Sequence, residues 1–316
     1  MNKSIGGYFG METGSGKDYH PKAIKLNTGR NCLTYIILSR GIKKIYLPYY
    51  CCDVLLEPLV KLRTEFAFYH INRLLDPVFN IAIKQNEAFL FINYFGLKQK
   101  KIPDLKNVFY NLIVDNAQSF FDKPYAGTDT FYSARKFFGV PDGAYLYCEK
   151  NLQKSLPIDD SIDRTRHLML RETISAEAGF DGYLKNEEAL SKVPLRQMSL
   201  LTKTMLNKTD YQKYKAIREK NFLIMHNAFA SVNEMVIGQS INGPMFYPLL
   251  INKKGLREKL HANKIYVAKY WENVLKRTKK EDFEYYLADN LIPLPIDQRY
   301  SAKEMKEMIK FVKAIL

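Results

Sequence analysis

The chain has 316 residues, 47% of them hydrophobic, and carries 48 lysines and arginines against 33 aspartates and glutamates, a net charge of +15. This apolar fraction excludes a wholly disordered chain, and the length suits one large domain or a large domain with a small one. No apolar run approaches the roughly 20 residues of a membrane span, and the first residues lack a signal peptide's apolar core. We therefore expect no membrane insertion and a cytoplasmic location.

The cysteines and the charge narrow the function classes further. Cys32, Cys51, Cys52 and Cys148 show neither metal-ligand spacing nor a disulfide framework, and no pair of histidines has metal-ligand spacing, so we predict reduced thiols and no metal. The basic residues are spread along the chain, and no nucleic-acid-binding motif is recognisable. The charge therefore favours an anionic small substrate over nucleic acid.

The first half of the chain alternates short apolar runs with helical patterns. Residues 27–41 predict a turn, a helix and a stop at Gly41, and residues 53–62 predict a second helix that Pro58 kinks or shortens. Apolar runs without polar alternation predict strands covered on both faces, at 44–50, 65–71, 88–95, 111–115 and 143–148. This order predicts an α/β domain with a mainly parallel sheet flanked by helices.

The second half has a different pattern. Residues 151–235 are predicted to be mostly helical, and a glycine-rich stretch near residue 237 begins a new unit. There we expect a strand at 244–251, a helix at 255–265, an extended segment at 291–297 and a terminal helix with a capping box from Ser301 to Glu304. The predicted organisation is an N-terminal arm (1–20), a large α/β domain (21–236) and a small C-terminal α+β domain (237–316).

Two features sit where an open parallel sheet binds its ligands, beyond the carboxyl ends of the strands. The stretch Thr28-Gly29-Arg30-Asn31 opens a helix, whose free N–H groups can hold a phosphate, although an ordinary capped helix start explains it equally well. Asp115 ends an apolar strand, where carboxylates often face ligands but also often form turns.

Two further features are candidates for covalent chemistry and for covering a flat ligand. Lys136 follows Ser133 by three residues, and a Schiff-base lysine needs an amine that is partly desolvated or near another cation, such as Arg135. In isolation, Lys136 is one of many surface cations. Tyr49, Tyr50 or Cys52, just after a strand, is placed to cover one face of a flat ligand, although tyrosines at such positions are often core residues.

Taken in order, these features resemble a known family. The stretches "NTGRNCLTYIILSRGIKKIYLPYYCCDV", "IVDNAQSF", "DTFYSARKFFGVPDGAYLY", "RQMSLLTKTML" and "LIPLPIDQRYSAKEMKEMIKFV" resemble the DegT/DnrJ/EryC1/StrS sugar aminotransferases. These are pyridoxal 5'-phosphate (PLP) enzymes of fold type I. The resemblance spans nearly the whole chain, and its most specific part is Asp-x-Ala-Gln followed by Ser-x-x-Lys.

The resemblance implies a role for each matching residue. Lys136 would form the Schiff base with PLP and shuttle the proton, and Asp115 would pair with the pyridine nitrogen, which keeps the ring an electron sink. Gln118 would lie near the 3-oxygen of the cofactor. The phosphate would be held by Gly29, Arg30, the backbone N–H of Asn31 and the hydroxyl of Ser133, and either Tyr50 or Cys52 would lie against the ring.

The resemblance also implies an activity and an assembly, with some departures. An amino acid, glutamate in the first instance, would give its amino group to a nucleotide-linked keto sugar for surface polysaccharide synthesis, in a homodimer. Phe131 replaces a phosphate-binding serine and Pro194 replaces an asparagine that reaches the partner subunit, while residues 150–195 do not align.

Two alternatives stay open at the level of sequence. A dehydratase or lyase of the same fold usually replaces the lysine by histidine, which Lys136 argues against. A non-catalytic, DNA-binding or regulatory protein on this fold is motivated by the basic charge.

Overall fold

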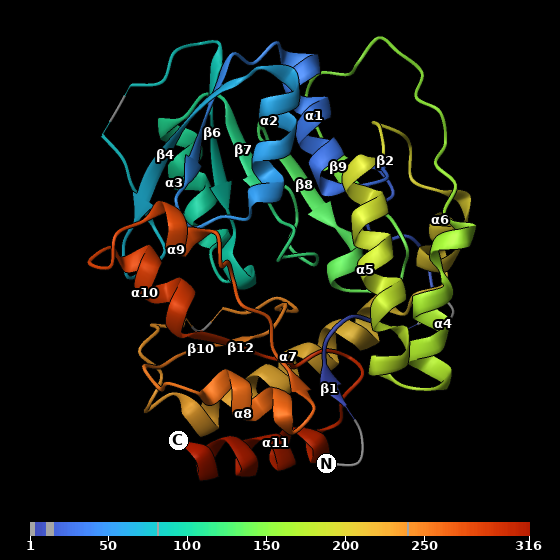
Figure 1. Ribbon diagram of the computed structural model, residues 1–316. Helices are drawn as coiled ribbons and strands as arrows, with labels where there is room; N and C mark the ends of the chain where they lie inside the picture. The colour runs from blue at the N-terminus through green and yellow to red at the C-terminus, as the bar shows by residue number, and fades with distance from the viewer. Residues whose placement is uncertain (1–3, 11–15, 81, 239) are drawn as a thin grey trace.

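The computed structural model describes residues 4–10, 16–80, 82–238 and 240–316 (Figure 1). Its strands are β1 (Ile5–Gly6), β2 (Ile24–Leu26), β3 (Lys44–Pro48), β4 (Glu65–Ile71), β5 (Pro77–Val78), β6 (Glu87–Ile92), β7 (Leu112–Asp115), β8 (Asp129–Ser133), β9 (Ala144–Tyr147), β10 (Tyr247–Leu250), β11 (Ile265–Tyr266) and β12 (Leu291–Leu294). Its α-helices are α1 (Gly29–Arg40), α2 (Leu56–Leu62), α3 (Ile102–Val108), α4 (Arg166–Thr173), α5 (Ala176–Lys192), α6 (Leu200–Asn207), α7 (Tyr211–Phe229), α8 (Leu256–Ala262), α9 (Val274–Arg277), α10 (Phe283–Asn290) and α11 (Ala302–Ile315).

An eight-stranded sheet in the order β2-β9-β8-β7-β6-β3-β4-β5 forms the centre of the α/β part. Strands β4, β3, β6, β7 and β8 run parallel, whereas β5 pairs antiparallel with β4, and β9 pairs antiparallel with both β8 and β2. This confirms the predicted mainly parallel sheet flanked by helices. Every residue of β6 is buried, which explains why the strand is a continuous apolar run after Glu87.

Local sequence accounts for the ends of the helices. Helix α1 begins after Thr28, whose hydroxyl accepts a hydrogen bond from the N–H of Asn31 at 3.1 Å, and ends at Gly41, which adopts φ 65°. Pro58 lies in the first turn of α2, where a backbone N–H would have no intrahelical acceptor, so the helix tolerates a proline there. The predicted helix is shortened at its start, where a 3₁₀ turn precedes α2. The Ser301–Glu304 capping box is present on α11.

A second apolar core lies below the sheet in Figure 1, between α7, α8, α11 and the antiparallel pair β10–β12. Ile5 of β1 belongs to this core because β1 pairs with β11. Val274 and Leu287, from the predicted small domain, are instead buried in the core of the sheet. The domain boundaries therefore stay a prediction, and positions 1–3 and 11–15 of the predicted arm lie outside the described residues.

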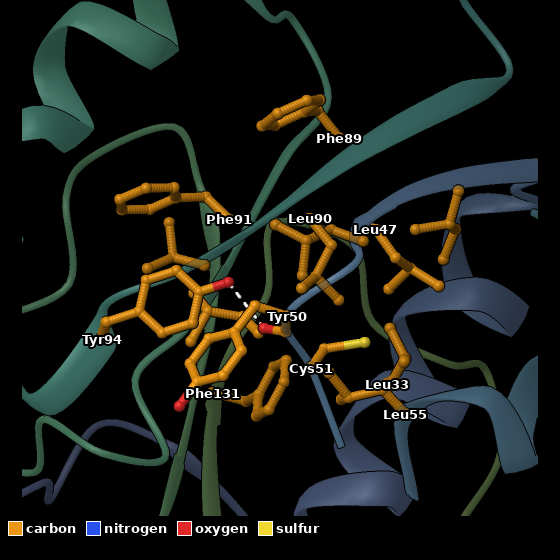
Figure 2. Close-up of a cluster of buried hydrophobic side chains, with 14 of the residues drawn as sticks. Leu33, Leu47, Tyr50, Cys51, Leu55, Phe89, Leu90, Phe91, Tyr94 and Phe131 are labelled. Carbon is orange, nitrogen blue, oxygen red and sulfur yellow. Dashed lines mark hydrogen bonds between the residues drawn. The ribbon is translucent and has the colours of Figure 1, made fainter. Parts of the chain in front are cut away.

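The core of the sheet is aromatic where it approaches the carboxyl ends of the strands (Figure 2). Tyr50, Tyr94 and Phe131 are buried there, and the Tyr94 hydroxyl donates to the carbonyl of Tyr50 at 2.7 Å. Such a packed layer gives a rigid floor to anything that lies above it. None of the described helices is both long and apolar enough to cross a lipid bilayer.

The stability of the fold should depend on pH through His20. His20 is only 2% exposed, its Nε2 lies 2.9 Å from the carbonyl of Phe120, and burial lowers its pKa to about 4. An unfolded histidine titrates near about 6.5, so below that pH the unfolded chain binds a proton that the folded chain excludes. We expect the free energy of unfolding to fall as the pH drops from about 6.5 to about 4, by up to about 1.4 kcal/mol per pH unit. Urea unfolding at several pH values should show a shallower dependence in His20→Gln, and equal slopes in both proteins would contradict this assignment.

The cap on α1 gives a second prediction. Thr28→Ala removes the acceptor for the Asn31 N–H and should lower the free energy of unfolding by about 1 kcal/mol, whereas Thr28→Ser should retain most of it. Thr204→Ala is the matched control, because the Thr204 hydroxyl is exposed and only donates back to the carbonyl of Leu200 within α6. Chemical denaturation measures all three, and an equal loss in Thr28→Ala and Thr204→Ala would show that the cap contributes nothing.

Candidate active site

A cavity of about 970 Å³ opens at the carboxyl ends of the parallel strands. The strands β3, β6, β7 and β8 all end at this edge, so the residues that follow them converge although they are far apart in sequence. Most of the predicted site residues line this cavity: Gly29, Arg30, Cys52, Asp115, Gln118, Ser133 and Lys136.

An amine and a carboxylate share the floor of the cavity. Asp115 is the last residue of β7 and is 7% exposed, and one of its oxygens accepts from the N–H of Ala117 at 2.8 Å. Burial raises the pKa of Asp115, while the nearby Lys136 ammonium and this hydrogen bond lower it. Lys136 ends a one-turn 3₁₀ helix directly after β8, and its amine has no hydrogen-bond partner among the described residues.

Gln118 presents a donor without an acceptor. Its side chain is 2% exposed and its Oε1 accepts from the N–H of Phe95 at 2.8 Å, but no described residue accepts from its Nε2. A buried donor without a partner costs about 1–3 kcal/mol. A ligand that offers an acceptor on this side of the cavity would remove that cost.

The start of α1 forms another wall of the cavity. The N–H groups of Gly29 and Arg30 lie in the first turn and have no intrahelical acceptor. The Arg30 guanidinium is held at 2.7 Å by Glu57, so its charge is already compensated. A Cβ built on Gly29 would touch only the Phe131 ring, at 3.9 Å, so open space adjoins these amides. An anion fits such a place.

Asn31 does not take the predicted position. Its N–H is engaged by Thr28, and its side-chain amide donates to Asn27 at 2.8 Å and to the carbonyl of Pro194 at 2.9 Å. It is not among the residues that line the cavity. Asn31 instead ties α1 to the segment before α6, so we leave it out of the proposed site. The sequence left both outcomes open, because a threonine directly before a helix can accept a hydrogen bond from the same N–H that would otherwise bind a phosphate.

The structure also separates Tyr50 from Cys52. Tyr50 is fully buried away from the cavity, where its hydroxyl donates to the carbonyl of Tyr270 at 2.5 Å and its ring packs on Trp271. Cys52 lines the cavity, and the electrostatic influence of both Lys136 and Asp115 reaches its thiol. Burial raises the pKa of Cys52, so the thiol faces the cavity as a neutral group.

Ser133 and Phe131 lie on the same strand with different surroundings. Ser133 ends β8, and both residues line the cavity, but the Phe131 ring is only 1% exposed and packs against Gly29 at the start of α1. The ring fills space under the helix start that a serine would leave open. A hydroxyl from this strand can therefore come only from Ser133 among the residues that line the cavity.

Other cavity residues make contacts that were not predicted from sequence. Arg135, expected to modify Lys136, forms an ion pair with Glu187 of α5, and its charge is thereby compensated. Tyr183 of α5 stacks on Tyr8 with the ring centroids 4.9 Å apart. These contacts join segments more than 50 residues apart, so no local pattern signals them. Further lining comes from Gly6, Phe9, Arg171, Met245, Asp297 and Arg299.

The residues present do not suit a metal. In the described part of the chain, no three histidine, cysteine, aspartate or glutamate side chains lie together in a way that would hold a metal ion. All four cysteines are free thiols. The cavity therefore offers an amine, a carboxylate, an unpaired amide and a helix start.

Comparison with known proteins finds relatives by structure alone, since no protein-family model and no curated protein matches the chain. Sugar aminotransferase CalS13 from Micromonospora echinospora superposes with a TM-score of 0.61 at 12% identity, covering 93% of this chain and 87% of that one. A DegT/DnrJ/EryC1/StrS aminotransferase from Brucella abortus superposes with a TM-score of 0.59 at 14% identity, covering 92% of this chain and 85% of that one. NtdA from Bacillus subtilis, with bound cofactor PMP, superposes with a TM-score of 0.62 at 10% identity, covering 93% of this chain and 73% of that one. The chain therefore has the fold of these aminotransferases, PLP-dependent transferase fold type I.

Proposed function

We propose that this protein is a PLP-dependent aminotransferase that moves an amino group from an amino acid to a keto sugar. The observation that carries the proposal is the placement of the Lys136 amine and the Asp115 carboxylate on one cavity at the carboxyl ends of parallel strands. The fold shared with sugar aminotransferases supports it.

The residues around the cavity fit PLP. The unpaired Nε2 of Gln118 suits the 3-oxygen, and the open space beside Gly29 suits a phosphate held by the N–H groups of Gly29 and Arg30. Ser133 would add its hydroxyl. The carboxylate of Asp115 would pair with the ring nitrogen, and Cys52 would face the ring. When bound, PLP supplies an electron sink for the bonds of the substrate's amine-bearing carbon.

The chain's own residues then have separable tasks. Lys136 would supply the amine that holds the cofactor's carbonyl carbon. Once the substrate amine has displaced it, the free Lys136 nitrogen would carry the proton between the substrate carbon and the cofactor carbon. Asp115 presents a desolvated carboxylate, whose interaction with a cation is strong because the surroundings are poor in water. The helix start at Gly29 and Arg30 would hold the phosphate and thereby orient the ring.

The finer parts of the proposal concern substrate and assembly. We take glutamate as the donor and a nucleotide-linked keto sugar as the acceptor, within surface polysaccharide synthesis. The net charge of +15 and Arg171 on the cavity support an anionic substrate, whereas the charge of Arg299 is compensated by Asp297 at 2.7 Å. We also propose a homodimer, which sedimentation of the active protein tests directly.

Covalent trapping tests the proposal. Protein mixed with PLP should gain absorption at the edge of the visible range, and borohydride should then attach the cofactor to Lys136, as peptide mass spectrometry would show. Lys136→Ala should lose this trapping, because no other lysine of the cavity is placed beside Asp115. Lys61→Ala, on the exposed face of α2, should trap as the wild type does.

Two results would overturn the proposal. Trapping of wild-type strength in Lys136→Ala would exclude Lys136 as the nucleophile. Absence of PLP binding by the wild type, together with a salt-dependent shift of duplex DNA, would favour the non-catalytic alternative.

The carboxylate gives a second test. Asp115→Asn should slow conversion of the bound cofactor by the amino donor by about a hundredfold or more, because the ring nitrogen loses its charged partner. Trapping on Lys136 should persist, which separates an electrostatic defect from loss of the site. Asp104→Asn, on the surface helix α3, is the control. Stopped-flow absorbance measures the rate, and a wild-type rate in Asp115→Asn would remove Asp115 from the proposed role.

A further inference from the structure

Arg218 of α7 is the largest completely buried side chain among the described residues, and it is 0% exposed. Its guanidinium donates to several oxygens at once. Nη2 reaches the carbonyl of Phe137 at 3.2 Å, Nη1 reaches the carbonyls of Pro244 and Met245, each at 3.2 Å, and Nε reaches the Oε1 of Gln298 at 2.9 Å. Its plane also lies over the Phe137 ring, 4.6 Å from the centroid.

These acceptors belong to three separate segments of the chain, each of which contributes at least one residue to the lining of the cavity. Phe137 directly follows Lys136, Met245 lines the cavity, and Gln298 lies between Asp297 and Arg299, which also line it. Gln298 reinforces the arrangement, because its Nε2 donates to the same Phe137 carbonyl at 2.7 Å. One guanidinium therefore joins the backbone beside Lys136 to two segments from the C-terminal part of the chain.

The loop that carries Lys136 is held at several points, among them the Arg135–Glu187 ion pair, a hydrogen bond from the side-chain amide of Asn186 to the carbonyl of Pro141 at 2.9 Å, and the buried ring of Phe138. At its ends, the N–H of Ala134 donates to the carbonyl of Gly143 at 3.1 Å, and Asp142 accepts from the N–H of Ser199 at 2.9 Å. Between these ends, the Phe137 carbonyl receives both Arg218 and Gln298. Hydrogen bonds from a charged donor contribute about 1.5–3 kcal/mol each, so their loss would loosen the backbone next to the amine.

The geometry requires arginine in particular. A guanidinium is planar, with donors in a fixed fork, so it can reach acceptors in different directions within its own plane. A lysine at this position has one nitrogen and would reach fewer of these oxygens. Burying a cation so completely is costly unless it is well hydrogen-bonded, which its bonds with four oxygens provide.

We propose that Arg218 is a positioning residue that, with Gln298, holds the Lys136 backbone at the distance from Asp115 that the reaction requires. This inference rests on the proposed function for the role of Lys136. A purely structural role would only connect the two cores of the protein. A positioning role also means that substitution of Arg218 changes the reactivity of Lys136.

The first test does not depend on the cofactor. Hydrogen–deuterium exchange of the protein without added PLP should show the 134–143 amides exchanging about tenfold faster or more in Arg218→Lys and in Gln298→Glu than in the wild type. Gln298→Glu keeps an acceptor for Arg218 but loses the donor to Phe137, and it guards against a failure of Arg218→Lys to fold. Arg40→Lys is the control, because Arg40 is also well buried and pairs with Asp129 at 2.7 Å, at the opposite end of β8 from Ser133. Exchange of this segment equal to that of the control would overturn the proposal.

The second test reads out the amine. The rate of covalent attachment of PLP to Lys136 should fall about tenfold or more in both variants and stay unchanged in Arg40→Lys, since a misplacement of about 1 Å can cost up to about a hundredfold. Free energies of unfolding measured in parallel separate this effect from a global loss of stability. Faster exchange with an unchanged attachment rate would show a structural tie only and would overturn the positioning role. If the wild type itself attaches no PLP, the proposed function fails, whereas the exchange experiment still decides whether Arg218 holds this loop.

Discussion

The parallel register of β3, β6, β7 and β8 is the constraint on which the rest of the structure depends. These strands are largely buried, and their common direction brings their last residues to one edge of the sheet. Asp115 and Ser133 each end a strand, and Lys136 follows one by three residues. A shift of one residue in β7 would turn Asp115 to the other face of the sheet, so the packing of the core also sets the position of the carboxylate.

The burial of Asp115 has opposing effects, and the balance between them matters for the site. Removal from water raises the pKa of the carboxyl, whereas Lys136 and the Ala117 N–H lower it. The low polarity that makes the carboxylate costly also strengthens its interaction with a cation. A surface aspartate would ionise more easily but would hold a protonated ring nitrogen only weakly. The net result is a raised pKa of the Asp115 carboxyl, which Lys136 and the Ala117 N–H keep from rising further.

Local patterns predicted the sheet, the start of α1 and the strand-end residues, because each depends on residues that are close in sequence. Asn31 and Tyr50 show the limit of such patterns. A helix start shows which N–H groups lack intrahelical acceptors, but it does not show that Thr28 has already engaged one of them. A tyrosine after a strand suits a ring platform and a core position equally, and here the Tyr270 carbonyl and Trp271 hold it in the core. Both partners are distant from Tyr50 in the sequence, and Tyr270 is 220 residues away.

The same limit explains why Arg218 was missed. In the sequence, Arg218 is one of the 48 basic residues of the chain, and it lies in a polar helical pattern, where a charged side chain is ordinarily expected to be exposed. Only the folded chain brings together the carbonyls of Phe137, Pro244 and Met245, which lie 81, 26 and 27 residues from it. A buried arginine that binds carbonyl oxygens depends on backbone geometry, and any movement of those segments changes its hydrogen bonds. The connection works in both directions: a substrate that shifts the walls at Met245 and Asp297 would also act, through Arg218 and Gln298, on the backbone that carries Lys136.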